Sequence, residues 1–343
     1  MSKRTPVEEL DLAIDALLGD LRGRAPKNNV RQATLVRVAA ELRDLPSENF
    51  KVRLKTELLA KSGTLKKSEL QTGSKLKEKE NMSTATVSPV RRGFRTITPY
   101  LQVMAVDEVI NFVKQAFGGR ELFRAPGGAG GIHAEMRVGD AMLMIGGGGT
   151  WMGPVRPAGM LIYVDDADEA YRRAIEAGAT SIHEPVDQPY GDREGSVTDV
   201  AGNNWYITTR RISEYAPAGF GDILLGFMPK GAAQFIDFLT AAFGAEAIMR
   251  HDAPNGTVGH ARIRIGNSIV MVSEPHGRYQ PMPAGIYTYV ENADETYERA
   301  IRAGATVLYP IADMPYGDRM GGVTDAFGNE WYISTHLKDM PRK

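Results

Sequence analysis

The stretch PYGDREGSVTDVAGNNWYITT, residues 189–209, decides the fold, because it returns as PYGDRMGGVTDAFGNEWYIST at residues 315–335. The two stretches agree at fifteen of their twenty-one positions, whereas average amino-acid usage would give about one or two matches. A repeat of this quality, offset by 126 residues, indicates that one domain has been duplicated in tandem.

The same offset extends outward from this stretch. ADEAYRRAIEAGAT, from Ala167, aligns with ADETYERAIRAGAT, from Ala293, and FVKQAFGGRELFR, from Phe112, aligns with FLTAAFGAEAIMR, from Phe238. Between these segments, GIHAEMRVGDAMLMI pairs with VGHARIRIGNSIVMV, whose histidine is one residue out of step. We therefore expect two copies of one domain, over residues 94–213 and 218–338.

The first half of each copy reads as a strand, a helix and three shorter strands. In the first copy an apolar strand is expected at 97–103 and a helix from about Asp107 to Phe117, which Gly118 ends by adopting a left-handed conformation. Gly139 and Asp140 between the last two strands are typical of a hairpin turn. This order predicts an α+β fold.

The second half starts the same order again. Residues 160–164 predict a strand, and Asp166 with Glu169 three residues later predicts the capped start of a helix that Gly178 ends. The second copy repeats the cap at Asn292. Each copy therefore consists of two modules of similar order.

Composition narrows the class of protein. The chain of 343 residues has no cysteine, which excludes disulfides, thiol nucleophiles, cysteine-ligated zinc and cysteine-held iron–sulfur clusters. No stretch approaches the roughly 18 to 20 consecutive apolar residues of a spanning helix, and the polar start lacks the apolar core of a secretion signal. We expect a cytoplasmic protein without membrane contact.

The chain ahead of the repeats has a different character. Apolar stripes predict helices over residues 1–62, and a stretch rich in Lys, Ser, Thr and Glu predicts a flexible linker over 63–93. Residues 1–93 carry 19 Lys and Arg against 12 Asp and Glu, a net charge of +7. Without aromatic stacking residues this basic charge does not predict nucleic-acid binding. The helices are expected to need a protein partner or the body to pack against.

The modules and the motif Y-G-D-R-x-G-x-V-T-D-x-x-G-N-x-W-Y-I resemble the glyoxalase/bleomycin-resistance, or vicinal oxygen chelate, superfamily, and most closely its PhnB-like branch. The resemblance implies that paired modules form a cupped mixed sheet, whose concave face holds a metal ion or a small ligand. It also implies an intramolecular pseudo-dimer, in which two fused copies replace the pair of domains that most relatives build by dimerising.

The resemblance also implies where metal ligands would stand. Metal-dependent members take His or Glu from the first and last strand of each module, and neither copy has a good ligand at those places, so the ligand positions support no divalent cofactor. The corresponding residues are Thr98, Met144, Gly159 or Met160 and Tyr206 in the first copy, and Leu224, Met271, Gly285 or Ile286 and Tyr332 in the second.

His133 and Glu135 are the candidate catalytic residues. They stand two apart on one expected strand and project from the same face, as a metal pair or an acid and base pair would. The second copy keeps the histidine as His260 but has Arg262 in place of the glutamate. There are two alternatives. The histidine could be hydrogen-bonded within the sheet, or one copy could hold a functional site while the other copy has lost it.

The repeated Y-G-D-R loop is a candidate ligand clamp. Its arginine could hold an anion bidentately while the tyrosine closes the pocket; the alternative is an Asp–Arg pair that braces the loop. The residues concerned are Tyr190, Asp192 and Arg193 in the first copy, and Tyr316, Asp318 and Arg319 in the second.

Four aromatic residues complete the candidate binding set. Trp205 and Trp331 could offer a stacking platform to a planar ligand or could pack the core, and Tyr163 and Tyr289 carry the same ambiguity.

Two further motifs are expected to be structural. The turns that begin at Asp199 and Asp325 combine a glycine with an aspartate that bonds its own backbone. The glycine run 146–149 lacks the Gly-Lys-Ser/Thr of a phosphate loop and is expected to be a mobile loop.

Three functions remain open from the sequence. The first is a small-molecule binder that sequesters its ligand without the usual metal. The second is a metal-dependent lyase, epimerase or dioxygenase that uses His133 and Glu135. The third is a regulatory protein in which the repeats sense a ligand and residues 1–62 contact a partner.

Overall fold

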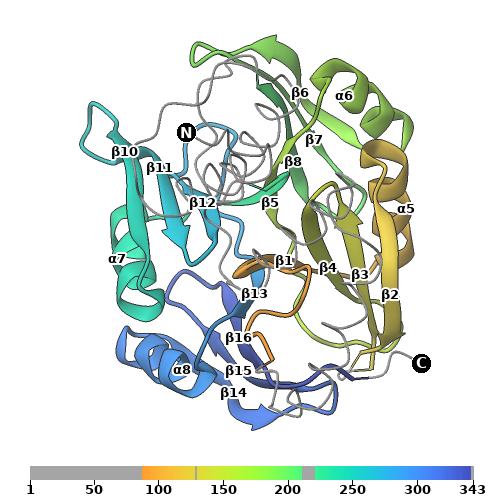
Figure 1. Ribbon diagram of the computed structural model, residues 1–343. Coiled ribbons are helices and arrows are strands. Elements are labelled where there is room, and N and C mark those ends of the chain that lie inside the picture. Colours follow the sequence, from red (N-terminus) through yellow and green to blue (C-terminus); the bar gives the residue numbers. More distant parts are fainter. Residues whose placement is uncertain (1–86, 128–129, 211–220, 341–343) are drawn as a thin grey trace, which may run out of the picture. The chain divides into compact units, whose positions relative to one another are not determined.

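The computed structural model describes residues 87–127, 130–210 and 221–340 (Figure 1). The helices expected within 1–62 and most of the expected linker lie outside these residues. Thr86–Lys343 forms one compact unit. None of the helices in the described part is long and apolar enough to cross a membrane.

The described chain contains four modules, each with one strand, one helix and three further strands. The first comprises β1 (Ile97–Val103), α5 (Val106–Phe117), β2 (Arg120–Pro126), β3 (Ile132–Val138) and β4 (Ala141–Gly147). The second comprises β5 (Gly159–Tyr163), α6 (Ala167–Glu176), β6 (Thr180–Asp187), β7 (Asp192–Thr198) and β8 (Asn204–Arg210). The third comprises β9 (Ile223–Phe227), α7 (Ala232–Phe243), β10 (Glu246–Asp252), β11 (Val258–Ile265) and β12 (Ser268–Val272). The fourth comprises β13 (Gly285–Tyr289), α8 (Ala293–Arg302), β14 (Thr306–Asp313), β15 (Asp318–Thr324) and β16 (Glu330–His336).

Local signals act as the sequence predicts. The Asp166 side chain accepts a hydrogen bond from the Glu169 amide at 3.0 Å, and Asn292 accepts one from the Glu295 amide at 3.2 Å. Gly118 closes α5 in the left-handed conformation, at φ 65°. These caps fix where three of the four helices begin or end.

The modules build two mixed sheets of eight strands, and each sheet draws on both copies. Sheet A has the order β14-β15-β16-β13-β1-β4-β3-β2, and sheet B has the order β10-β11-β12-β9-β5-β8-β7-β6. The copies meet where β1 runs antiparallel to β13 and where β5 runs antiparallel to β9. Sheet A therefore joins the first module of copy one to the last module of copy two.

The helices, in contrast, pack in pairs within each copy. Helix α5 contacts α6, and α7 contacts α8 (Figure 1). Trp205 of β8 packs against Phe117 of α5, with ring centroids 4.8 Å apart, although the strands of their two modules belong to different sheets. Trp331 packs on Phe243 of α7 in the same way, at 4.5 Å. The helix pairs and the tryptophan contacts are thus made within one repeat, while the sheets are shared between repeats.

The Asp-containing turns are structural, as expected. The Asp199 carboxylate accepts hydrogen bonds from the amides of Ala201 and Asn203 and from the indole of Trp205, at 2.9 to 3.0 Å. Asp325 does the same for the second copy. Each aspartate thereby holds its turn against the tryptophan of the following strand.

The glycine run corrects an expectation. Gly146 and Gly147 belong to the buried strand β4 instead of a loop. A Cβ on Gly146 would lie 2.4 Å from the Tyr100 hydroxyl, a separation that real Cβ atoms do not show. The glycine is needed because the tyrosine ring of β1 lies against this strand.

Candidate functional site

Each sheet has an inner face, the face turned away from the helices. Along β1, Leu101 and Val103 join the helix-side core, while Thr98, Tyr100 and Gln102 alternate with them and face inward. The same alternation assigns the inner residues of every other strand. The two inner faces are the candidate sites.

The inner face of sheet A is filled by aromatic and thioether side chains. One buried cluster combines residues of both copies with a residue that precedes β1. Its members are Phe94, Met142, Met144, Tyr287, Tyr289, Met320 and Tyr332, with Val90, Tyr100, Tyr309 and Met314 partly buried around them.

Part of this filling comes from Pro89–Phe94, a segment that ends at the first residue of the first repeat and that we call the strap. Arg91 donates to both carboxylate oxygens of Glu135, at 2.6 and 3.0 Å, and its guanidinium lies 4.8 Å from the Phe94 ring centroid. Phe94 in turn meets Tyr289 edge-on at 5.7 Å. The amide of His336 donates to the Pro89 carbonyl at 2.9 Å. The last residues of the expected linker are therefore part of the folded body, which corrects that expectation.

Glu135 is a buried charge on β3, 1 % exposed. Burial disfavours its carboxylate, but the interactions with His133 and Arg91 outweigh this and hold the pKa of Glu135 below its usual range. His133 lies 3.7 Å from the Glu135 carboxylate and 3.5 Å from the Tyr100 hydroxyl. The two candidate catalytic residues thus share the inner face of sheet A, as the sequence predicts, but the strap covers Glu135.

A second buried carboxylate, Asp318, organises the opposite half of this face. It accepts hydrogen bonds from the hydroxyls of Tyr287 and Tyr289, at 2.8 and 3.2 Å, and contacts His336 Nδ1 at 2.7 Å. Burial raises the pKa of both tyrosines, which keeps them neutral donors. These partners of the Asp318 carboxylate all belong to strands of sheet A.

The inner face of sheet B differs at matching positions. The 126-residue offset pairs Tyr287 with Leu161, Met320 with Glu194 and His336 with Arg210, and Glu135 matches Arg262. Six positions that are buried in sheet A are half-exposed in sheet B. They are Leu161, Tyr163, Glu194, Arg210, Arg262 and Met271, against Tyr287, Tyr289, Met320, His336, Glu135 and Met144.

The polar contacts of sheet B centre on two residues. Arg210 donates to the Tyr163 hydroxyl at 2.7 Å, and its guanidinium lies 4.5 Å from the Tyr163 ring centroid. The Glu194 carboxylate accepts from the hydroxyls of Thr208 and Tyr190, at 3.1 and 3.4 Å. This face therefore combines guanidinium, carboxyl and phenol groups.

Burial shifts the titration of this face toward neutral forms. It raises the pKa of Glu194, whose hydrogen bonds to Thr208 and Tyr190 offset the effect only in part. Burial also raises the pKa of Asp192, against the charges of Arg210 and Arg262. The pKa of His260 is lowered, first by burial and then by Arg262. Perturbed groups of this kind are typical of functional sites.

The arginines of the Y-G-D-R loops lie on the helix side, away from the inner faces. Arg193 is held by Asp168 of α6 and by Asp187 at 3.0 Å, and Arg319 is held by Asp294 of α8 at 2.6 Å. These are the contacts of the bracing alternative. The preceding aspartates, Asp192 and Asp318, face inward, because side chains alternate along β7 and β15.

The loop tyrosines lie at the rims. Tyr190 is 60 % exposed and Tyr316 is 48 % exposed. Tyr190 reaches Glu194, while the Tyr316 hydroxyl lies 3.5 Å from the Met320 sulfur. Each tyrosine therefore contacts an inward-facing residue of its own sheet.

The tryptophans take the second of the two roles that the sequence left open, which removes them from the candidate binding set. Trp205 and Trp331 are 0 % exposed and pack under α5 and α7. A side chain on the helix side of a strand cannot reach the inner face of the same sheet. Neither indole can stack on a ligand, because both belong to the core.

The candidate histidines lie on different sheets. His133 belongs to β3 of sheet A, and His260 belongs to β11 of sheet B. The two histidines therefore do not share one inner face.

Because each sheet combines one module of each copy, the positions at which metal-dependent relatives are expected to hold their ion come from both copies in each sheet. Within each sheet the four places carry an aliphatic or hydroxyl residue, a methionine, a glycine and a tyrosine, which do not suit zinc, nickel or iron. They are Thr98, Met144, Gly285 and Tyr332 in sheet A, and Leu224, Met271, Gly159 and Tyr206 in sheet B. Over residues 87–127, 130–210 and 221–340, three or more His, Asp or Glu side chains nowhere gather as a metal site.

Sequence reasoning missed Glu194, Arg210 and Arg91 as site residues. The first two could have been found by comparing the copies, since each replaces an uncharged or weakly basic residue at an inward position of β7 or β8. Arg91 could not, because nothing in the repeats indicates that the preceding segment returns onto the sheet.

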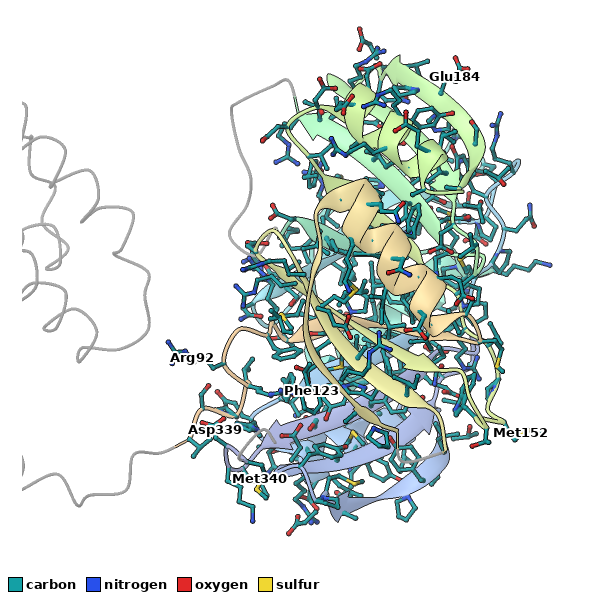
Figure 2. The ribbon with its side chains drawn as sticks, turned by 90° about the vertical axis from the view of Figure 1, so that its right-hand side faces the viewer. Arg92, Phe123, Met152, Glu184, Asp339 and Met340 are labelled. Carbon is teal, nitrogen blue, oxygen red and sulfur yellow. The ribbon has the colours of Figure 1, made fainter. Side chains whose placement is uncertain are left out.

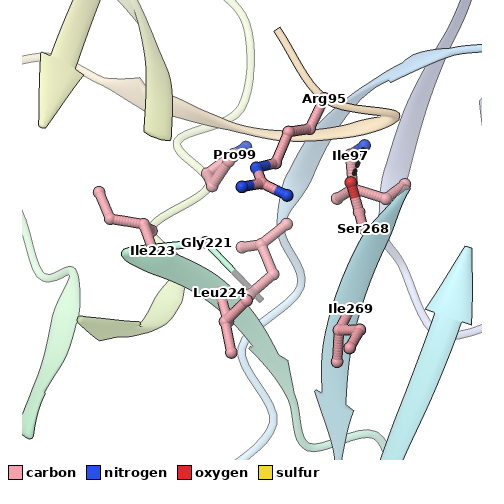
Figure 3. Close-up of a pocket in the computed structure, with 9 residues that line it drawn as sticks. Arg95, Ile97, Pro99, Gly221, Ile223, Leu224, Ser268 and Ile269 are labelled. Carbon is pink, nitrogen blue, oxygen red and sulfur yellow. Dashed lines mark hydrogen bonds between the residues drawn. The ribbon is translucent and has the colours of Figure 1, made fainter. Parts of the chain in front are cut away.

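A small cavity lies between the two sheets, where β1 meets β9 and β12 (Figure 3). Arg95, Pro99, Leu224 and Ser268 are among its lining residues, and its volume is about 10 Å³. That is room for one water molecule at most. It is a packing defect at the junction of the copies, too small for a ligand.

Comparison with known proteins places both repeats in one family. The family model "Glyoxalase/Bleomycin resistance protein/Dioxygenase superfamily" matches residues 94–207 and 226–333. An uncharacterized protein of Mycobacterium bovis is 32 % identical over 120 residues, which is 32 % of this chain and 79 % of that protein. A Mycobacterium tuberculosis relative, also uncharacterized, has the same identity over 71 % of its length.

Solved structures agree on the fold. Glyoxalase I from Zea mays superposes with a TM-score of 0.55 at 14 % identity, over 70 % of this chain and 92 % of that chain. A putative dioxygenase from Bacillus subtilis gives 0.50 at 14 % identity, over 71 % and 85 %. The expected fold class, two tandem domains of paired modules, is thereby confirmed.

Proposed function

This chain belongs to the glyoxalase/bleomycin resistance protein/dioxygenase superfamily, and we propose that it is a small-molecule-binding protein whose ligand lies on the inner face of sheet B. The observation that carries the proposal is the contrast between the sheets. The same six positions are buried in sheet A and half-exposed in sheet B. A ligand can reach the side chains of sheet B, while the chain itself fills sheet A.

The chemistry of sheet B favours a ligand with an anionic or oxygen-rich group. Arg262 and Arg210 supply guanidinium donors, which suit carboxylates and phosphates. Glu194, whose pKa is raised by burial, adds a carboxyl group to the same face. Leu161 and Met271 offer apolar contact beside these groups.

The proposal uses no resident metal. The donors at the four positions of each sheet are too poor in nitrogen and carboxylate oxygen to hold zinc, nickel or iron. Binding on sheet B then rests on hydrogen bonds, ion pairs and apolar contact from the chain's own residues.

Thermal denaturation with benzoate as the probe tests the proposal. Benzoate is expected to raise the melting temperature of the full chain, by about 5 °C at a concentration a hundredfold above its Kd. Arg262→Met is expected to weaken binding about tenfold or more, because it removes a charged donor.

Arg250→Met is the matched control. Arg250 is an exposed arginine of the neighbouring strand β10 and pairs with Asp252 at 2.7 Å. Its loss should leave the benzoate response unchanged. Equal responses of Arg262→Met and the full chain, or no response of the full chain to benzoate, would refute this assignment.

A further inference from the structure

The strap occupies the inner face of sheet A much as a ligand would. Apart from Phe94 it lies ahead of the first repeat, and it places a cation on Glu135 and an aromatic ring on Tyr289. Val90, Arg91 and Phe94 pack inward, whereas Arg92 is exposed and points away from the body (Figure 2).

Glu135 explains why this face needs a cation. Its side chain is 2 % exposed, and two of its hydrogen bonds come from Arg91. A carboxylate removed from water is costly unless it is paired and hydrogen-bonded. The bidentate geometry is the one that planar guanidinium and amidinium groups adopt with carboxylates.

The aromatic surroundings suit the same class of group. The Arg91 guanidinium lies 4.8 Å from the Phe94 ring centroid, and the ring of Tyr289 follows behind Phe94. Aromatic faces attract cations, more strongly where water is excluded. Carboxylate and aromatic rings together form a site for a flat organic cation.

The second copy has lost both members of this pair. Glu135 is matched by Arg262, and at the 126-residue offset Arg91 is matched by Pro217. Arg262 is itself a cation, so this position does not need a second cation from the preceding segment. The cation and the carboxylate are therefore present together in one copy and absent together from the other.

We propose that the strap is a built-in competitor, and that the inner face of sheet A binds a small aryl cation of the amidinium or guanidinium class when the strap leaves. The ligand's cation takes the place of the Arg91 guanidinium on Glu135, and its ring takes the place of Phe94 on Tyr289. Sheets A and B then have opposite preferences, a cation for A and an anion for B.

The test is chemical rescue with benzamidinium, using the full chain. Arg91→Ala is expected to lower the melting temperature, and benzamidinium is expected to raise it again by about 5 °C at a hundredfold excess over Kd. The unmodified chain and Arg92→Ala should respond at least tenfold more weakly, because the strap still covers Glu135. Adding Glu135→Gln to Arg91→Ala should abolish the response.

Two further measurements keep the test decisive. If Arg91→Ala does not fold, Arg91→Met replaces it, since methionine keeps the apolar stem and removes the charge. If neither folds, hydrogen exchange of the unmodified chain is followed with and without benzamidinium. Displacement of the strap should speed exchange of the His336 amide, which bonds the Pro89 carbonyl at 2.9 Å.

Three results would overturn the proposal. The first is a folded arginine variant that responds to benzamidinium no better than Arg92→Ala. The second is a response that survives Glu135→Gln. The third, where only the unmodified chain can be studied, is an unchanged exchange rate of the His336 amide.

Discussion

Tyr289 and Tyr163 stand 126 residues apart at the same place in the repeat, yet their hydroxyls have different hydrogen-bond partners. Tyr289 donates to the buried Asp318 at 3.2 Å, whereas Tyr163 accepts from Arg210 at 2.7 Å. The last residue of the neighbouring strand differs with them, since His336 at the end of β16 corresponds to Arg210 at the end of β8. One duplicated scaffold has therefore produced one closed and one accessible face.

Filling sheet B should abolish its binding. Leu161→Tyr places on β5 the residue that sheet A has at Tyr287. The larger ring is expected to occupy ligand space and to weaken benzoate binding about tenfold or more, as overpacking of a fitted site does. Titration calorimetry with benzoate measures the affinity, and Leu161→Met, which keeps the volume, is the control. Unchanged affinity of Leu161→Tyr would place the ligand elsewhere.

The stability of the chain should depend on pH through Glu194. Burial raises the folded-state pKa of this carboxyl, so the stability it contributes is present below its unfolded pKa and is lost as pH rises through the folded value. Glu194→Gln removes this loss. The variant should match the parent near pH 4 and melt at a higher temperature at pH 7. A variant that is less stable than the parent at pH 7 would show that the carboxylate is stabilised by the fold.

The turn aspartates should be worth far more than surface carboxylates. Asp325→Ala removes the acceptor for the amides of Phe327 and Asn329 and for the indole of Trp331. Leaving these buried donors unsatisfied is expected to cost about 3 kcal/mol of unfolding free energy. Urea denaturation measures the loss. Asp252→Ala, on an exposed carboxylate, should stay within about 0.5 kcal/mol, and equal losses would contradict the assignment.

Metal should not contribute to the stability of the folded body. The donors at the expected positions are a methionine, a glycine and a tyrosine in each sheet, joined by Thr98 or Leu224. Treatment with EDTA is expected to leave the melting temperature unchanged within about 1 °C, and elemental analysis of protein purified without chelator should find no stoichiometric Ni, Zn, Fe or Mn. Stoichiometric metal that is lost in His133→Ala would restore the metal-dependent alternative.

Much of the fold could be predicted because its signals are local. The capping aspartate at Asp166, the left-handed glycine at Gly118 and the turn at Asp199 act within a few residues of themselves. Alternation along a strand is equally local, and it correctly put His133 and Glu135 on one face. Because the repeat occurs twice, an inference made for one copy also applied to the other.

The sequence by itself determined the duplicated modules, their caps and turns, and the absence of thiol chemistry. Only the tertiary structure decided which modules share a sheet, which side of a strand is covered by helices, and that Arg91 reaches Glu135. The reason is physical. Local patterns set the order of helices and strands, but the pairing of β1 with β13 and the return of the strap depend on contacts between residues far apart in the chain, which periodicity does not record.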